Sequence, residues 1–161
     1  MRLFSELGGF IIFSPEKLGM FCKQKEIGSD IMSFLTSNES GDIITAEGIA
    51  TPIFNLEPDD YKIEVKIHTD FEMNCDASKV SIGWLFNSTG SLCICGAGYF
   101  FDYNYDQLIS NGNIFEVEIE KGWYSMTFSL PEKDLLRINL KSEKKAPPLF
   151  GDFNFKFNFI R

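Results

Sequence analysis

Acidic and aromatic side chains alternate in the stretch "YFFDYNYDQ" (residues 99–107), which is the segment whose residue types most suggest chemistry. Asp102, Asn104 and Asp106 have the spacing that opens a calcium-binding loop. The rest of that loop is missing, because its sixth position is Gln107 in place of glycine and its twelfth is an asparagine in place of glutamate. We therefore predict no metal site and no other cofactor.

The rings of the same stretch leave two interpretations open. On a strand or in a wide loop, the polar groups would lie on one side and Phe101, Tyr103 and Tyr105 on the other. In the first interpretation the rings fill the core. In the second, tyrosines beside acids form a protein-binding surface, since tyrosine is enriched among the residues that dominate binding energy.

Glu116, Glu118 and Glu120 place a row of like charge on one face of a predicted strand. Such a row is commonly a solvated face or a guard against edge pairing. Next to the acids of the preceding stretch, it also predicts an acidic patch. The residues that we predict to bind a partner are Asp102, Tyr103, Asn104, Tyr105, Asp106, Glu116 and Glu118.

The sequence holds no recognisable catalytic constellation. His68 is the only histidine, and it falls on the polar side of a strand between Lys66 and Asp70. A Ser-His-Asp or Cys-His arrangement would have to use it, yet no G-x-S-x-G accompanies it. There is no P-loop, G-x-G-x-x-G or H-E-x-x-H motif. We predict a protein that is not an enzyme.

Four cysteines stand at positions 22, 75, 93 and 95. Cys93 and Cys95 share one strand face, where a bridge from i to i+2 would be badly strained. The closely spaced Cys or His pairs of a zinc site are missing. Reduced thiols packed as small hydrophobic groups are the expected state.

Composition indicates a folded, acidic domain. The 161 residues are 44% hydrophobic and 15% aromatic, which is too much for a disordered chain. We expect one domain over residues 1–161, with 1–41 as its less regular part. The net charge of -8 opposes nucleic acid and anionic membranes and favours basic partners. With no signal-peptide pattern and no membrane-spanning apolar run, we predict a cytoplasmic protein.

Hydrophobic residues at every second position predict the fold class. In "DFNFKFNFI" (152–160) every second residue from Phe153 to Phe159 is phenylalanine. Further segments alternate in the same way: "YKIEVKIHT", "KVSIGWLF", "NIFEVEIEKG" and "GWYSMTFSL". We predict an all-β, single-domain antiparallel β-sandwich with "NSTG" (87–90) as a hairpin turn and short strands in "DIITAEGIATPIF" (42–54).

At most one or two short helices are expected near the N-terminus. One would begin after Ser14 and Pro15. The other would be capped by Ser29 or Asp30 and end at "NESG".

Three segments follow one another along the chain: "GGFIIF", the irregular region before "DIITAEGIATPIF", and "FEVEIEKGWYSMTFSL". Their order resembles that of the bacterial immunity proteins and nuclease inhibitors of the competence protein J type. The resemblance implies an inhibitor that binds a toxin or nuclease, and no family residue is carried over. Two alternatives are a carbohydrate- or calcium-dependent binding module and a structural or assembly protein of phage or secretion type.

Overall fold

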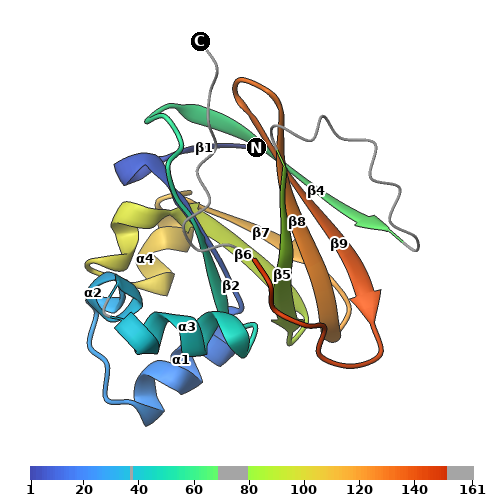
Figure 1. The fold of residues 1–161 in the computed structure, drawn as a ribbon. Helices are drawn as coiled ribbons and strands as arrows, with labels where there is room; N and C mark the ends of the chain where they lie inside the picture. Colours follow the sequence, from blue (N-terminus) through green and yellow to red (C-terminus); the bar gives the residue numbers. More distant parts are fainter. Residues whose placement is uncertain (37, 69–79, 152–161) are drawn as a thin grey trace.

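The computed structural model describes residues 1–36, 38–68 and 80–151, which form two β-sheets and several short helices (Figure 1). The five-stranded sheet has the order β1-β4-β9-β8-β5. Its strands are β1 (Arg2–Phe4), β4 (Asp60–His68), β9 (Leu135–Glu143), β8 (Gly122–Glu132) and β5 (Val80–Ser88). The four-stranded sheet consists of β3 (Ala50–Ile53), β2 (Phe10–Phe13), β6 (Ser91–Gly96) and β7 (Ile114–Glu118), in that order.

One face of each sheet contributes to a shared core. From the four-stranded sheet come Phe10 and Ile94, and from the five-stranded sheet come Phe86, Phe128 and Ile138, all at most 1% exposed. Alternation along the strands produces this arrangement, because successive side chains point to opposite faces. The four residues of "GWYSMTFSL" that were predicted to face inward are buried: Tyr124, Met126, Phe128 and Leu130. Thr127 and Ser129 between them are buried too, so the alternation is confirmed in part.

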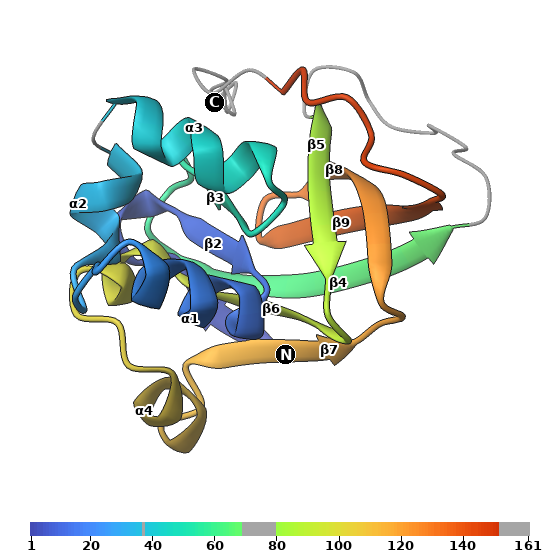
Figure 2. The same ribbon diagram turned by 90° about the horizontal axis from the view of Figure 1, so that it is seen from below.

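The other face of the four-stranded sheet is covered by helices (Figures 1 and 2). These are α1 (Pro15–Gln24), α2 (Ile31–Thr36), α3 (Asn38–Ala46) and α4 (Tyr105–Ser110), with the 3-10 turns η1 (Glu6–Gly8) and η3 (Ala97–Phe100) beside them. We call the buried residues between them the helix-side core: Ile11, Phe13, Leu18, Phe21, Ile31, Met32, Ile44, Ile49, Ala50, Cys93, Cys95, Ala97, Phe100, Leu108 and Ile114.

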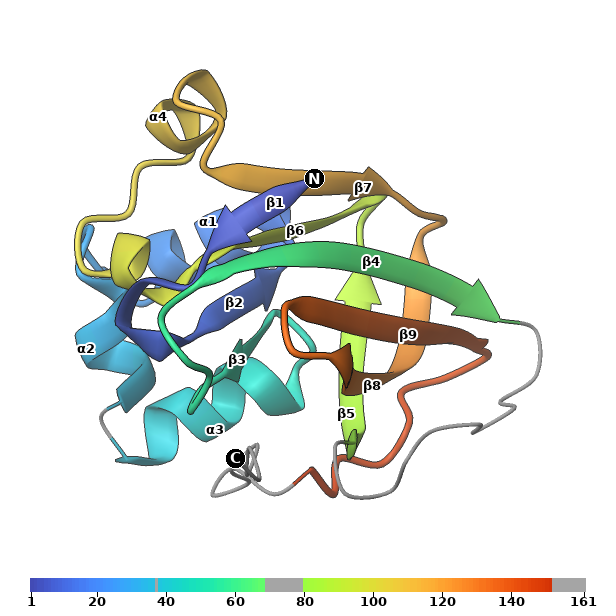
Figure 3. The ribbon, with the colours of Figure 1, turned by 90° about the horizontal axis from the view of Figure 1, so that it is seen from above.

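The pairing of the described strands is mainly antiparallel, as predicted, and one pair departs from the prediction. β4 lies parallel to β9, with Ile63 opposite Leu136 and Ile67 opposite Leu140. Figure 3 shows β4 running along β9. Parallel neighbours need a long connection. Here the chain between the two strands is long enough to build β5 to β8, and pattern alone gives no signal of pairing direction.

The helices are also more numerous than predicted. The predicted starts of α1 at Pro15 and of α2 after Asp30 are confirmed; the Asp30 carboxylate accepts a hydrogen bond from the Ser33 amide at 3.0 Å. However, "NESG" belongs to α3, and the predicted strand from residue 42 is helical as far as Ala46. A short apolar run does not distinguish a strand from a helix.

The turn "NSTG" does not close a hairpin. β5 before it pairs with β8, whereas β6 after it pairs with β2 and β7 in the other sheet. The turn therefore carries the chain from one sheet to the other (Figure 3). The phenylalanine strand predicted at 152–160, and Cys75, lie outside the described residues. Among the residues that the structure describes, no helix is both long and apolar enough to cross a membrane.

Cys93 and Cys95 lie in the helix-side core, fully buried on one strand face, whereas Cys22 is only partly buried. Burial raises the pKa of Cys93 from 9.0 to about 12 and also raises that of Cys95. The unfolded thiols ionise first as the pH rises, so this burial stabilises the fold below about pH 9 and the benefit is lost towards pH 12.

We expect iodoacetamide at mildly alkaline pH to modify Cys22 first, and Cys93 and Cys95 only when the fold opens. Peptide mapping of a labelling time course measures each rate, and sub-denaturing urea should accelerate only the two buried sites. Equal rates at all three sites in native conditions would contradict this burial.

Candidate functional site

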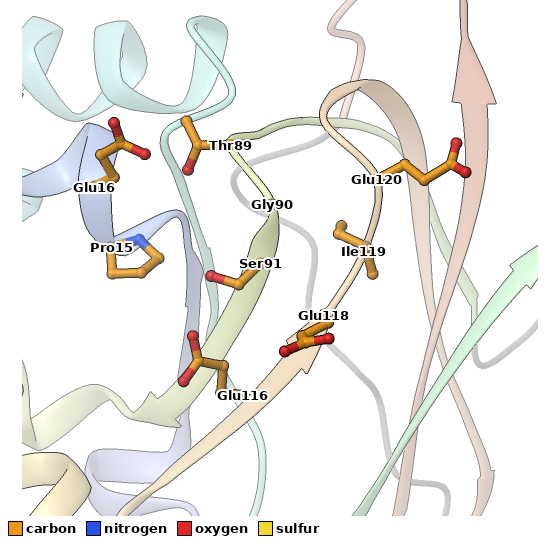
Figure 4. Close-up of a pocket in the computed structure, with 9 residues that line it drawn as sticks. All are labelled: Pro15, Glu16, Thr89, Gly90, Ser91, Glu116, Glu118, Ile119 and Glu120. Carbon is orange, nitrogen blue, oxygen red and sulfur yellow. The ribbon is translucent and has the colours of Figure 1, made fainter.

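An open groove of about 590 Å³ lies where the N-terminus of α1, the turn after β5 and strand β7 meet (Figure 4). Four of its nine lining residues are glutamates. The lining residues are Pro15, Glu16, Thr89, Gly90, Ser91, Glu116, Glu118, Ile119 and Glu120. We call this set the acidic groove.

The groove exists because the helices cover only part of the sheet face beneath them. Along β7, the residues on the helix side change from Ile114, which is buried, to Glu116 and Glu118, which are exposed. Their partners on β6 are Cys93 and Ser91. The apolar end of this face therefore belongs to the helix-side core, and its polar end forms the floor of the groove.

The side chain of Lys121 lies next to Gly90 in the groove lining, but among the described residues it forms no ion pair with the carboxylates there. Among the described residues, none of Glu16, Glu116, Glu118 and Glu120 takes part in an ion pair. Figure 4 shows Glu116 and Glu118 next to each other on β7, with Glu120 pointing away. The described part of the chain also contains no group of three or more His, Cys, Asp or Glu side chains that could hold a metal ion. The groove is thus a negatively charged surface that is suited to a basic ligand.

Tyr105 does not line the groove, but it contacts one of the lining residues, Glu116. Its hydroxyl donates to Glu116 Oε1 at 3.5 Å and lies 4.0 Å from Cys93 Sγ. Burial and the neighbouring Cys93 raise the pKa of Tyr105, so the hydroxyl stays protonated at neutral pH. The ring is partly exposed and packs against the helix-side core. Tyr105 can therefore offer a partner a rigid ring beside a carboxylate.

Tyr103 faces the core, as in the first of the two interpretations that the sequence left open. Its ring centroid lies 5.8 Å from that of Phe13 and 5.1 Å from that of Phe100. Desolvation raises the pKa of its hydroxyl. Its ring packs against the core, so Tyr103 is not part of the proposed partner-binding surface.

The other residues predicted from 99–107 lie away from the groove. The Asn104 side-chain oxygen accepts from the Gln107 amide at 3.1 Å and so caps α4. Asp102 and Asp106 are exposed, and neither lines the groove. The chain becomes helical at Tyr105, so the calcium-like spacing coincides with a helix cap and not with a loop.

Sequence reasoning missed the α1 side of the groove. Glu16 follows Pro15 at the start of a helix, where an acidic residue is expected for its interaction with the helix dipole. The helix dipole therefore accounts for Glu16 without any reference to the groove. The sequence does not show that Glu16 and Glu116, which are distant in the chain, line the same groove. His68 lies elsewhere, on β4, with its Nε2 at 2.9 Å from Asn139 Oδ1.

Comparison of this chain with protein-family models, with curated proteins and with solved structures finds no significant match. The resemblance to inhibitors of the competence protein J type therefore stays a prediction. Any function proposed for the groove therefore depends on the charge, shape and contacts of its lining residues.

Proposed function

We propose that this protein is a non-enzymatic inhibitor of the immunity or antitoxin type, which binds a basic surface of a toxin or nuclease through the acidic groove. The observation that carries the proposal is that Glu16, Glu116 and Glu118 gather around one open groove and that none of them takes part in an ion pair among the described residues. The inhibitor class follows the resemblance found in the sequence.

Charge explains why such a partner would be recognised. A nuclease must hold a polyanion, so its active cleft needs a positive potential. A protein of net charge -8 is drawn to such a cleft by long-range attraction, which raises the association rate. The groove is open rather than enclosed, and this shape favours a protein surface over a small ligand.

Charge alone gives little affinity, so a buried contact is also required. Tyr105 can supply one, because its ring is partly exposed and its hydroxyl bonds to Glu116 of the groove. A basic side chain of the partner would contact Glu116 while the apolar part of the interface covers Tyr105. Tyr105, Glu116 and Glu118 are thus the residues of the predicted surface that we retain, and Glu16 joins them.

Two finer assignments accompany this proposal. The shared core of the two sheets supports classification of the fold as a β-sandwich with an added helical layer. The three cysteines among the described residues are free thiols, which supports action in the reducing cytoplasm.

Neutralising the groove is expected to stabilise the free protein. In the double variant Glu116→Gln, Glu118→Gln, the free energy of unfolding should rise by about 0.2–1 kcal/mol, because like charges on one strand face repel. Glutamine at 116 still accepts from Tyr105. Urea unfolding at low and high salt measures the gain, which should shrink as salt increases.

The matched control is Glu26→Gln, Glu132→Gln, which removes the same charge at two exposed positions outside the groove. It should change stability less than the groove variant does. A loss of stability in the groove variant would mean that Glu116 and Glu118 make stabilising contacts. That result would contradict the repulsion between these two carboxylates.

The function is tested by affinity capture from the host cell at low salt, followed by an activity assay. Three baits are compared: the wild type, Glu116→Lys with Glu118→Lys, and the control Glu26→Lys with Glu132→Lys. We expect one basic protein to be held by the wild type and the control but lost with the groove variant. Its purified activity should then fall in proportion to added wild-type protein. A partner retained by the groove variant, or one whose activity does not change, would contradict the proposal.

A further inference from the structure

A second cavity, of about 250 Å³, lies between η3 and α4, on the other part of the segment that the sequence singled out. Tyr99 and Phe101 contribute aromatic surface to it, and Leu108 contributes a buried apolar side chain. Its polar groups come from Asp102, Asn104, Gln107, Asn111 and Asn113. None of these residues lines the acidic groove, so the two sites are separate.

The polar lining is rich in side-chain amides and nearly free of charge. Asp102 is the only ionisable group in it apart from the Tyr99 phenol, and no cation lines it. The side-chain amides of Gln107 and Asn113 make no hydrogen bond within the described part of the chain. The amide NH₂ of Asn104 is also unused, because only its oxygen caps α4. The cavity therefore offers both donors and acceptors to a neutral ligand.

Phe101 is the least expected residue at this site. It is 49% exposed, and its ring makes no aromatic contact within the described residues. Its neighbour Phe100 is fully buried in the helix-side core. A ligand that covers this exposed aromatic ring would remove apolar surface from water, which favours binding.

We propose that this cavity binds a neutral carbohydrate, one sugar ring at a time. The absence of a lining cation disfavours phosphates and carboxylates. The volume is below the roughly 300–1,000 Å³ of drug-sized ligand sites, so it suits a single ring. Vicinal hydroxyls can exchange hydrogen bonds with the Asp102 carboxylate and with the amides, while the C–H face of the sugar stacks on Phe101.

Local structure explains only part of this lining. Asn104 is the N-cap of α4 and Asn111 follows its last residue, so both have roles as cap residues. Gln107 and Asn113 are not the cap residues of α4, and Phe101 contributes little to the core. A bound ligand would account for the presence of these three residues in the lining.

The test is a titration of the isotopically labelled protein, followed by amide NMR shifts. The probes are glucose, galactose, mannose and N-acetylglucosamine, each added separately. At least one should give saturable shifts confined to residues 98–113. Phe101→Ala and Gln107→Ala should each weaken its affinity about fivefold to tenfold. The control Ile109→Ala, an exposed residue of α4 outside the cavity lining, should bind like the wild type.

A blocked neutral tripeptide is titrated in parallel. Saturable shifts with the peptide and none with the sugars would overturn the carbohydrate assignment, as would sugar shifts that both cavity variants leave unchanged. The groove variant Glu116→Lys, Glu118→Lys should bind sugar normally. Failure of this inference is thus separable from failure of the inhibitor proposal.

Discussion

Replacing Tyr103 by alanine is expected to lower the free energy of unfolding by about 2–3 kcal/mol. The ring packs against Phe13 and Phe100, at centroid distances of 5.8 and 5.1 Å, and its removal leaves a cavity in the helix-side core. Tyr103→Phe keeps the ring and should change stability by less than about 1 kcal/mol, since the hydroxyl makes no hydrogen bond within the described residues. Urea unfolding of the three proteins measures both values.

Phe101→Ala is the matched control for this variant. The residue lies two positions away but is 49% exposed, so its loss should change stability by no more than about 0.5 kcal/mol. If Tyr103→Ala were as stable as Phe101→Ala, the ring would not be part of the core. Tyr103 would then return to the candidate contact surface, as in the second interpretation of the sequence.

Reversing the charge of the groove should have the largest effect on binding. With the proposed basic partner, Glu116→Lys combined with Glu118→Lys is expected to slow association at least about tenfold at low salt. The difference should shrink as ionic strength rises, because salt screens exposed charges. Tyr105→Ala should act mainly on the dissociation rate, since it removes a short-range contact. Stopped-flow or surface-based kinetics at several salt concentrations separate the two rates.

The control for charge reversal is Glu26→Lys with Glu132→Lys, which changes the net charge by the same amount at exposed sites outside the groove. Its association should slow much less than that of the groove variant. Equal slowing in both variants would show that only the net charge matters, and that the groove has no special role.

Local pattern predicted the parts of the fold in which one face is buried and the other solvated. The alternation of β7 is one case, and it also placed Glu116 and Glu118 together on a strand face. The pattern failed where a short helix has the same succession of buried and exposed residues as a strand. In α3, Ile44 is buried and its neighbour Ile43 is 44% exposed, an arrangement that a short strand would equally give.

Long-range placement was beyond prediction for a physical reason. The groove needs Glu16 of α1 to lie opposite β7, and this depends on how far the helices extend over the sheet. The parallel pairing of β4 with β9 likewise depends on the whole path of the chain between them. Neither arrangement can be inferred from the spacing of residues within one segment. For Tyr103 and Tyr105, the sequence predicted a contact surface or a core position but did not show to which side each ring points.

Hydrogen–deuterium exchange of the complex with the basic partner is the most direct test of the central claim, that the acidic groove is the binding surface. We expect the partner to protect amides of residues 14–18, 89–91 and 114–120 and to leave 98–104 unchanged, because the first three ranges contain the residues that line the groove and the last contains none. Protection confined to the free faces of β4 and β9, with the groove exchanging as in the unbound protein, would contradict the account.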